Sequence, residues 1–288
     1  MSYRLENFAD RIEMDLLTPL LQQSAFSARV FHHGNLCHLA DFDPGAMAGH
    51  LHLFKGGRLS CTLRDTLVLD TDRPCALLFP RPSAHTLLPV GERGADLVCA
   101  TLDLGFKTGG PLAMALPECL VLYLDDAPNL LPTLQLLFDE AFSERFARQA
   151  ALDRLMEYFL IQAIRAVIDS GQIHSGIFAA MTDPKLARAV NAIHARPERG
   201  WTVELLAEQA GMSRARFAAR FREQVGLSPL DYLTDWRLAV VRHQLRQGHA
   251  IKRIAAQVGY ASPAALSRVF AQRLGLPPSD WLKQQAAI

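Results

Sequence analysis

Short apolar runs and turn residues alternate through residues 36–103. The runs are LCHLADF, HLHLF, RLSCTL, TLVLD, CALLF, AHTLL and DLVCATL, and Gly, Pro, Asp and Arg separate them. Short strands at such close spacing are typical of an antiparallel sandwich or a small barrel. We therefore expect an antiparallel β domain in the first half of the chain.

The spacing of the apolar positions changes after Asn129. Apolar residues then recur at i, i+3, i+4 and i+7, which is the pattern of one face of a helix. The stripe comprises Leu152, Leu155, Met156, Phe159, Leu160, Ala163, Ile164 and Val167. Such a stripe suits the core of a domain and also the seam of a two-helix dimer, and both interpretations stay open. Residues 170–176, SGQIHSG, are expected to be a linker.

From Asp183 onward the pattern is helical, and Ser, Thr or Asp precedes most of the expected helices. These side chains accept hydrogen bonds from the free N–H groups of a first turn, and Pro suits the first helical position. The expected starts are Asp183-Pro184, Thr202, Ser213, Ser228-Pro229, Ser262-Pro263 and a site near Pro278-Ser279.

The helical region contains an internal duplication, VELLAEQAGMSRARFAARFREQVGLSP at 203–229 and IKRIAAQVGYASPAALSRVFAQRLGLPP at 251–278. Ala207 matches Ala255 and Gly211 matches Gly259 at an offset of 48, and after one inserted residue Ser213 matches Ser262 and Phe221 matches Phe270 at an offset of 49. Each copy reads helix, Gly-containing turn, helix. This is the pattern of a helix-turn-helix unit, whose second helix enters the major groove of DNA.

A helical wheel separates the faces of the two second helices. The inward residues are Phe217, Phe221, Leu266 and Phe270. The opposite face of the first copy carries Ala215 and Ala219, flanked by Ala218, Arg222 and Arg216, and that of the second carries Arg268 beside Ala264 and Ala265. The segment 229–246 between the copies is expected to form one helix about 27 Å long, which can hold the two second helices about one DNA turn apart.

The net charge of +1 hides a division of charge along the chain. Residues 1–182 contain 14 Lys and Arg against 21 Asp and Glu, whereas residues 183–288 contain 16 against 8. A basic C-terminal third indicates a polyanionic partner at that end. Together with the duplication, this charge predicts double-stranded DNA as the partner.

The composition bounds the class of protein. The chain has 288 residues, 50% hydrophobic and 20% charged, which suits two globular domains. No run approaches the length of a membrane span, and the N-terminus lacks a signal pattern, so we expect a cytoplasmic protein with no membrane partner. The five cysteines all precede residue 120 and include no CxxC pair, so we expect reduced thiols.

The last hundred residues resemble the DNA-binding domain of the AraC/XylS family of transcription regulators. The resemblance rests on WTVELLAEQAGMSRARFAARFREQVGLSPLDYLTDWRL and IAAQVGYASPAALSRVFAQRLGLPPSDW. It implies a sequence-specific regulator, most often an activator, with RNA polymerase as a further partner. We expect a homodimer, because the specific contacts of one domain rarely suffice against competing genomic sites.

The resemblance also implies which residues face the groove. They are Arg214, Ala215, Ala218 and Ala219 in the first copy, and Pro263, Ala264, Ala265 and Arg268 in the second. Most are too short to hydrogen-bond a base, but alanine can contact thymine methyl groups and Arg268 can bind guanine with two hydrogen bonds. Phosphate contacts or solvated surface positions are the two interpretations for Arg216, Arg220, Arg222, Arg242 and Lys252.

Most of the chain before residue 180 resembles the cupin-like effector domain of one branch of that family, on the segments HLHLFKGG, LLFPRPSAHTLL, LVCATLDLG and DPKLARAVNAIHARPERGW. We therefore expect an α+β chain. Residues 1–125 would form a cupin-like antiparallel barrel that senses an effector. Residues 126–180 would form a helical connector, which is the candidate dimerisation element, and residues 183–288 an all-α domain with two helix-turn-helix units.

A metal-binding cupin supplies an HxH pair, a carboxylate, and a further His after a proline-containing turn. His50 and His52 lie two apart and share a strand face, and His85 follows two prolines. The carboxylate is missing, because Gly56 and Gly57 stand where it is expected. An oxygenase site of the two-His-one-carboxylate type is therefore not expected.

A symmetric hairpin of AHTLL and DLVCATL would place His85 opposite Cys99. With His50 and His52 this gives a nitrogen and sulfur set suited to zinc or another divalent metal. Alternatively Cys99 is a redox-responsive thiol, as in similar members of this branch, or the residues are polar barrel positions and core filler. The effector class therefore stays open between a small molecule, a metal and an oxidant.

Two enzymes are the rival interpretations: a cupin-type metal-dependent enzyme, and a DNA-repair methyltransferase fused to the same DNA-binding module. The first needs the carboxylate that the sequence lacks. The second needs a nucleophilic Cys with an adjacent base and also a metal-held cysteine cluster, and the sequence shows no such cluster. We therefore expect a regulator and no enzymatic activity.

Overall fold

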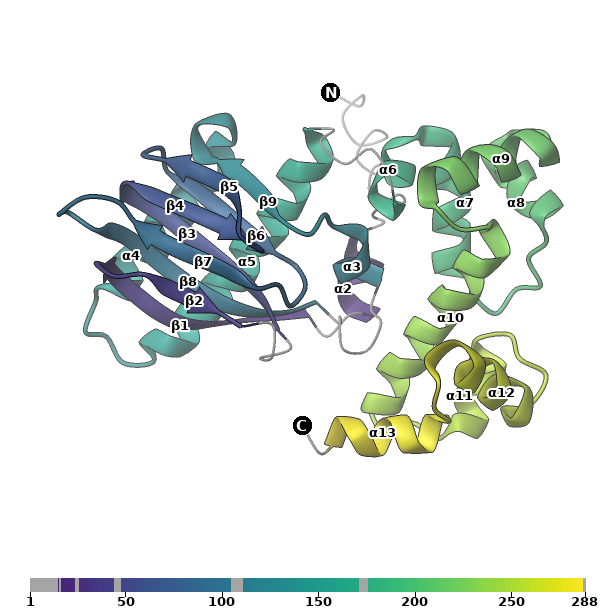
Figure 1. Cartoon of the computed structure of the whole chain (residues 1–288). Helices are drawn as coiled ribbons and strands as arrows, with labels where there is room; N and C mark the ends of the chain where they lie inside the picture. Colours follow the sequence, from purple (N-terminus) through teal and green to yellow (C-terminus); the bar gives the residue numbers. More distant parts are fainter. Residues whose placement is uncertain are drawn as a thin grey trace, which may run out of the picture. The chain divides into compact units, whose positions relative to one another are not determined.

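The computed structural model describes residues 15, 17–23, 26–43, 48–104, 111–170 and 176–286. The chain divides into two compact units, residues 25–173 and residues 1–24 with 174–288 (Figure 1). Most of the expected linker, residues 171–175, lies outside the described residues.

The first unit is a sandwich of two antiparallel sheets, as the short apolar runs predicted. One sheet has the order β1-β8-β3-β6-β9 and the other β2-β7-β4-β5. The strands are β1 (Phe26–Leu36), β2 (Ala40–Phe42), β3 (Gly49–Gly57), β4 (Leu59–Leu63), β5 (Thr66–Thr71), β6 (Cys75–Phe79), β7 (His85–Pro89), β8 (Ala95–Leu104) and β9 (Leu120–Tyr123). Strands β1 and β9 lie outside the predicted β region.

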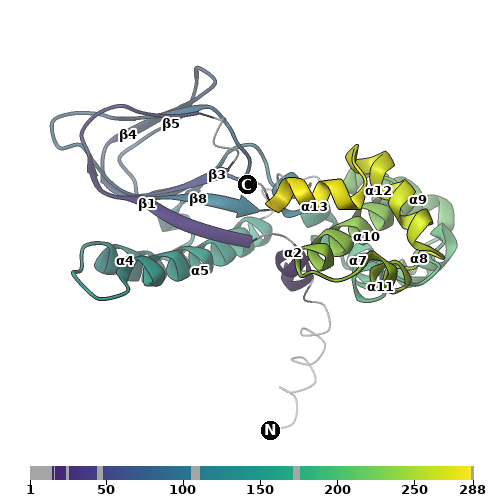
Figure 2. The same cartoon turned by 90° about the horizontal axis from the view of Figure 1, so that it is seen from below.

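Helices cover the outer face of the five-stranded sheet. The unit contains α3 (Pro111–Ala115), η3 (Leu124–Asp126), η4 (Pro128–Leu130), α4 (Leu131–Ala141) and α5 (Arg148–Asp169). Figure 2 shows α4 and α5 running along β1 and β8, and α5 packs directly on β1. Because one face of β3 meets the inside of the sandwich and the other lies under cover, residues 49–54 are buried without a break.

The apolar stripe of α5 is core. Its members Leu152, Met156, Phe159, Leu160, Ala163, Ile164 and Val167 are buried inside the unit, whereas Leu155 is only partly buried. The buried members pack within their own unit, so they leave no apolar seam for a second copy. Of the two interpretations that the sequence left open, the structure favours the core.

Helix α5 also fixes the irregular part of β1. The pairing of β1 with β8 shifts between Val30 and His32. The Val30 N–H donates to Asp153 Oδ1 at 2.9 Å, and Gln149 Nε2 donates to the Val30 carbonyl at 2.8 Å. Two side chains of α5 thus supply the partners that a regular ladder would have supplied, which stabilises a bulge that turns His32 inward.

The second unit is helical. It contains α2 (Leu17–Gln23), α6 (Ile177–Thr182), α7 (Pro184–Ala195), α8 (Val203–Ala210), α9 (Arg214–Val225), α10 (Pro229–Arg246), α11 (Ile251–Gln257), α12 (Pro263–Leu274) and α13 (Pro278–Ala286). The short helix α2 packs against α10. Within the described ranges, no helix combines the length and the hydropathy needed to cross a bilayer.

The predicted helix starts are confirmed. The Asp183 carboxylate accepts from the N–H groups of Lys185 and Leu186 at the start of α7. Ser228 caps α10 and Ser262 caps α12 by accepting one backbone N–H each. These local hydrogen bonds are encoded in short stretches of sequence, which is why they could be predicted.

Candidate DNA interface and effector site

The two helix-turn-helix units have the same turn. Gly211 between α8 and α9 has φ +61°, and Gly259 before α12 has φ +79°. Each turn is closed by an equivalent backbone hydrogen bond of 2.9 Å, Met212 N to Ala207 O and Tyr260 N to Ala255 O. This left-handed region of φ is open to glycine at little cost, so the duplicated glycines serve the same conformational purpose.

The inward faces of the second helices are anchored as the helical wheel predicted. Phe217 and Phe221 of α9, and Leu266 and Phe270 of α12, are completely buried. These side chains fix the rotation of each helix about its axis, and so determine which residues face outward. In both views α9 and α12 lie on the same side of α10 (Figures 1 and 2).

The predicted DNA-binding residues, both the groove-facing ones and the candidate phosphate contacts of α9, lie on the outer faces of α9 and α12. The exposed ones are Arg214, Ala215, Arg216, Ala219, Arg220, Arg222, Ala264 and Arg268. The partly buried ones are Ala218, Pro263 and Ala265. Alanines therefore alternate with arginines on these faces, and the alanines let the helix backbones approach a partner closely.

Two of the candidate arginines are occupied within the protein. Arg214 Nε lies 2.5 Å from Glu204 Oε1, and Arg220 Nε lies 2.6 Å from Asp183 Oδ2. A phosphate would have to compete with these carboxylates. Arg268 has no hydrogen bond or ion pair to any described residue, so its charge is available to a partner.

Arg242 must be removed from the candidate phosphate contacts. Its side chain is only 4% exposed, and burial lowers the pKa of its guanidinium to about 10. It lies on the inner side of α10, so neither interpretation proposed for it, phosphate contact or solvated surface residue, is correct. The basic count of the C-terminal third therefore overstates the charge that DNA can meet.

Three of the buried histidines lie together inside the sandwich. His52 Nε2 of β3 lies 2.9 Å from His85 Nε2 of β7, so the pair joins the two sheets. The ring of His50 lies 5.2 Å from that of His85 and 5.8 Å from that of His52. A fourth residue, His32, lies close enough to lower the pKa of His52. We call these four residues the histidine cluster.

Aromatic rings hold His85 in place. Its ring stacks on Phe79 at 3.8 Å and on Phe42 at 4.7 Å between centroids, with interplanar angles of 14° and 7°. His85 Nδ1 lies 2.7 Å from the Ser83 carbonyl. A carbonyl only accepts, so Nδ1 carries the proton and Nε2 of the neutral ring presents its lone pair to His52, whose Nε2 must then donate.

Burial keeps the cluster uncharged. It lowers the pKa of His85 to about 4 and that of His52 well below its ordinary value, with further lowering of the His52 pKa by the neighbouring histidines. The ring nitrogens His50 Nδ1, His52 Nδ1 and His32 Nε2 are buried and have no hydrogen-bond partner among the described residues. Buried polar atoms are normally paired, so the cluster offers neutral nitrogens to something that could pair them.

The predicted neighbourhood of His85 and Cys99 is wrong in its geometry. Strand β7 pairs with β2 and β4, whereas β8 belongs to the other sheet, so the two segments do not form one hairpin ladder. Cys99 instead pairs with His52 on one side and with His32 on the other. The hairpin argument failed because a short loop joined strands that lie in different sheets.

The thiol of Cys99 is buried and unreactive in this state. Burial raises the pKa of Cys99 to about 12, so the thiol stays protonated. In the part of the chain that the structure describes, no three His, Cys, Asp or Glu side chains are arranged to hold a metal ion. The set of His50, His52, His85 and Cys99 is therefore not assembled as four ready ligands.

Sequence reasoning missed three residues of this site, His32, Phe42 and Phe79. His32 escaped because β1 was not predicted, although the pair His32-His33 lies in an alternating stretch. The phenylalanines read as ordinary core. Their role as plates on either side of His85 depends on which strands meet across the sandwich, and no local pattern reports that.

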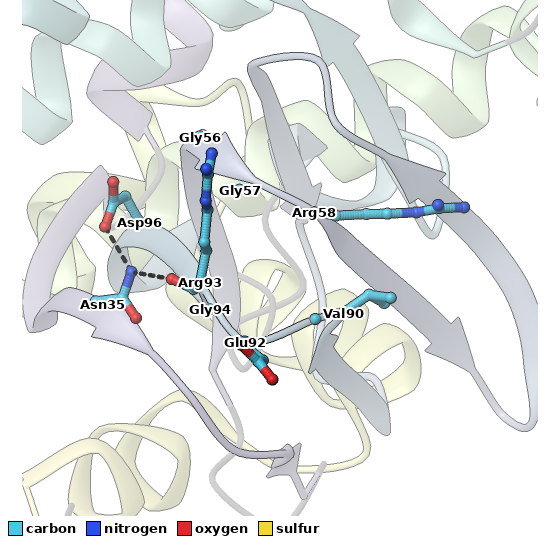
Figure 3. A pocket seen from close by; sticks show the side chains of 10 residues that line it. Asn35, Gly56, Gly57, Arg58, Val90, Glu92, Arg93, Gly94 and Asp96 are labelled. Carbon is cyan, nitrogen blue, oxygen red and sulfur yellow. Dashed lines mark hydrogen bonds between the residues drawn. The ribbon is translucent and has the colours of Figure 1, made fainter.

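A separate open pocket of ≈ 610 Å³ lies at the other end of β3, near Gly56 and Gly57 (Figure 3). Several of its polar groups pair with one another in the wall. Asn35 Nδ2 donates to Asp96 Oδ1 at 2.8 Å and to the Arg93 carbonyl at 3.1 Å, and Arg58 points away from the pocket toward its ion pair with Asp70. The pocket is therefore a weaker candidate for a binding site than the histidine cluster.

Comparisons with known proteins cover both units. A family model described as Cupin matches residues 15–169, and one described as Helix-turn-helix domain matches residues 206–284. An uncharacterized HTH-type transcriptional regulator of Haemophilus influenzae is 33% identical over 257 residues, which are 82% of this chain and 86% of that protein.

Two further relatives are similar over different shares of the chain. The RCS-specific HTH-type transcriptional activator RclR of Escherichia coli is 30% identical over 210 residues, 71% of this chain and 74% of that protein. A Streptomyces lividans regulator described as AraC-like is 47% identical over 110 residues, 38% of this chain and 36% of its own length. The cupin match, the duplicated helix-turn-helix and these relatives agree: the chain belongs to the AraC/XylS family of transcriptional regulators, with an N-terminal cupin domain.

Proposed function

We propose that this regulator activates transcription by placing α9 and α12 in the major groove of one DNA site. The observation that carries the proposal is the exposure of two equivalent helix faces on the same side of α10, each made of small residues and arginine. Ala215, Ala219 and Ala264 would contact thymine methyl groups, and Arg268 would bind guanine. Because few side chains can read bases, DNA shape would contribute to specificity.

Selection from a randomised duplex pool, followed by footprinting, tests this proposal. We expect a preferred sequence protected over about two helical turns, since two recognition helices about one turn apart contact it. Affinity should fall steeply between low and physiological salt because phosphate contacts release counterions. Equal binding to every duplex, or binding insensitive to salt, would contradict the proposal.

We propose further that the histidine cluster is where the effector acts, and that a divalent metal such as zinc is the effector class to test first. Neutral imidazoles whose other ring nitrogen donates to a carbonyl are suited to metal binding, and His85 with Ser83 has that arrangement. His52 and His85 would supply the first two nitrogens through Nε2, and the proton now on His52 Nε2 would move to the unpartnered Nδ1 of the same ring. A small molecule and an oxidant are the alternatives.

Elemental analysis of the purified chain beside two variants tests the effector class. We expect bound metal in the wild type and in His38→Ala, which removes an exposed histidine of the same unit, and loss of metal in His85→Ala. Equal metal content in all three would place the metal elsewhere. No bound metal after incubation with Zn²⁺ would leave the small molecule and the oxidant as effectors.

Activation and self-association are part of the proposal. The Escherichia coli relative is named a transcriptional activator, and we propose the same direction for this chain, with RNA polymerase as partner. We also propose a homodimer, formed through a surface other than the buried stripe of α5. A reporter behind the selected site would rise on expression of the chain, and light scattering would give the mass of two chains. A reporter that falls would make the chain a repressor.

A further inference from the structure

The turn of the second helix-turn-helix unit contacts the loop between α7 and α8, which leads into the first unit. Arg237, at the middle of α10, reaches the loop between α7 and α8, just before the first helix-turn-helix unit. Its Nε donates to the Pro197 carbonyl at 2.6 Å and its Nη2 to the Arg199 carbonyl at 2.9 Å. The same guanidinium lies 5.6 Å from the ring centroid of Tyr260, in the turn of the second unit. One side chain therefore contacts both the α7–α8 loop and the turn of the second helix-turn-helix unit.

Backbone contacts add to this junction. A Cβ placed on Gly259 would lie 2.4 Å from the Glu198 carbonyl oxygen and 2.8 Å from Arg237 Nη2. The turn of the second helix-turn-helix unit thus packs directly on the α7–α8 loop, at a distance that only glycine permits. We call Arg237, the loop residues 197–199 and the turn residues 259–260 the inter-unit junction.

The equivalent glycine of the first unit makes no such contact. A Cβ on Gly211 would meet only Arg188 Nη2, at an ordinary distance of 3.6 Å. Gly211 and Gly259 share the same left-handed backbone, so the close approach is a property of the junction and not of the turn. Of the two duplicated turns, the second packs closely on the α7–α8 loop and on Arg237.

The loop that receives the second unit is itself rigid. Trp201 is buried, its Nε1 donates to the Arg196 carbonyl at 2.9 Å, and the Arg199 guanidinium lies 4.3 Å from its ring centroid. On the other side, Arg273 of α12 forms ion pairs with Asp231 and Asp235 of α10. The second helix-turn-helix unit is thus held to α10 by its recognition helix and to the α7–α8 loop by its turn.

We propose that Arg237 is a positioning residue that fixes the two recognition helices at one separation and one relative angle, and so sets the spacing of the half-sites that this chain can read. The inference rests on the proposed DNA binding. It assigns Arg237 no contact with DNA. Its function would be to keep α9 and α12 from adjusting independently to two half-sites.

DNA geometry makes the consequence large. One additional base pair between half-sites moves them apart by about 3.4 Å and rotates them by about 34°. A rigid pair of helices cannot follow both changes, so it loses the contacts of one half-site. A loosened pair can follow them, but it must be ordered on binding and so binds its best site less tightly.

The test uses duplexes that the full-length wild type selects from a randomised pool, remade with one base pair inserted between the two protected half-sites. For the wild type we expect the insertion to reduce affinity roughly tenfold or more, because it removes one of two sets of contacts. For Arg237→Ala we expect weaker binding to the original site and a penalty below roughly threefold for the insertion. Arg188→Ala is the matched control, because Arg188 donates to the Ala210 carbonyl within the first unit alone, and it should keep the wild-type penalty.

A second pair of variants keeps the test decisive if Arg237→Ala does not fold. Gly259→Ala should relax the spacing requirement, and Gly211→Ala, which has the same backbone strain without the close contact, should keep it. The inference is overturned if both junction variants keep the wild-type penalty, or if the wild type selects a site and tolerates the extra base pair. A wild type that selects no sequence refutes the DNA-binding proposal itself, and this inference with it.

Discussion

His194 on α7 makes the stability of the helical unit depend on pH. Its Nε2 lies 2.6 Å from the Tyr232 hydroxyl, and its ring stacks on Trp236 at 3.7 Å between centroids. Both partners belong to α10, so the imidazole joins α7 to α10. Burial lowers the pKa of His194 to about 3. The folded protein therefore holds this ring neutral where the unfolded chain would protonate it.

The magnitude follows from the two pKa values. Above pH 6.5 the ring is neutral in both states and contributes no pH dependence. As the pH falls below 6.5 the unfolded chain takes up a proton that the folded state refuses, so the free energy of unfolding falls, until it levels off near the folded pKa. Between pH 7 and pH 5 the loss amounts to about 2 kcal/mol for this group alone.

Urea unfolding of wild type and His194→Phe at pH 7, 6 and 5 measures this loss. All three tryptophans, Trp201, Trp236 and Trp281, lie in the helical unit, so tryptophan fluorescence reports on that unit. Phenylalanine keeps the stacking but leaves the buried Tyr232 hydroxyl unpaired, which costs about 1–3 kcal/mol at every pH. The variant should therefore be less stable at pH 7 and lose less stability on acidification.

The difference between the two curves is the decisive quantity. It should shrink by about 2 kcal/mol from pH 7 to pH 5. His249→Phe, at an exposed position of the same unit, should keep the wild-type slope. Parallel curves for wild type and His194→Phe would refute the reasoning, because the ring would then titrate alike in the folded and unfolded chain.

Three further outcomes are expected. Arg268→Ala should relax the preference at one base pair of the selected site, at a cost of about 1–3 kcal/mol, and quantitative binding to single-base variants of the site will show whether the loss is instead uniform, as for a phosphate contact. Asp183→Ala should lower the stability of the helical unit by about 1 kcal/mol through loss of its cap on α7, whereas Asp183→Asn should retain most of it in thermal unfolding. Iodoacetamide should modify exposed Cys37 well before Cys99, because burial keeps the Cys99 thiol protonated. Equal rates of modification by mass spectrometry would argue for a reactive Cys99.

The features that the sequence predicted well are encoded over short distances along the chain. Ser228 and Asp183 announce helix starts because a cap involves residues two or three apart. Phe217 and Phe221 indicate an inward face because they lie one helical turn apart. The duplication added a comparison of the chain with itself, so the architecture of the helical unit could be predicted almost completely.

The features that escaped depend on residues far apart in the sequence. In the sequence Arg242 resembles the exposed arginines of α9, and no local pattern shows that α10 turns it inward. Cys99 was assigned to the wrong partner because the sheet to which a strand belongs is settled by the whole sandwich. The histidine pair His52 and His85 was named correctly, yet its contact comes from opposite sheets and not from the hairpin that suggested it.

The turns of the two units also bear on how this sequence can drift. Both glycines need a left-handed backbone, and asparagine is the residue that next most readily adopts it. The space around Gly211 would admit an asparagine side chain. At Gly259 the backbone of Glu198 occupies the position that a Cβ would need. Position 211 can therefore change through evolution without loss of the turn. Position 259 is restricted to glycine by its contact with the α7–α8 loop.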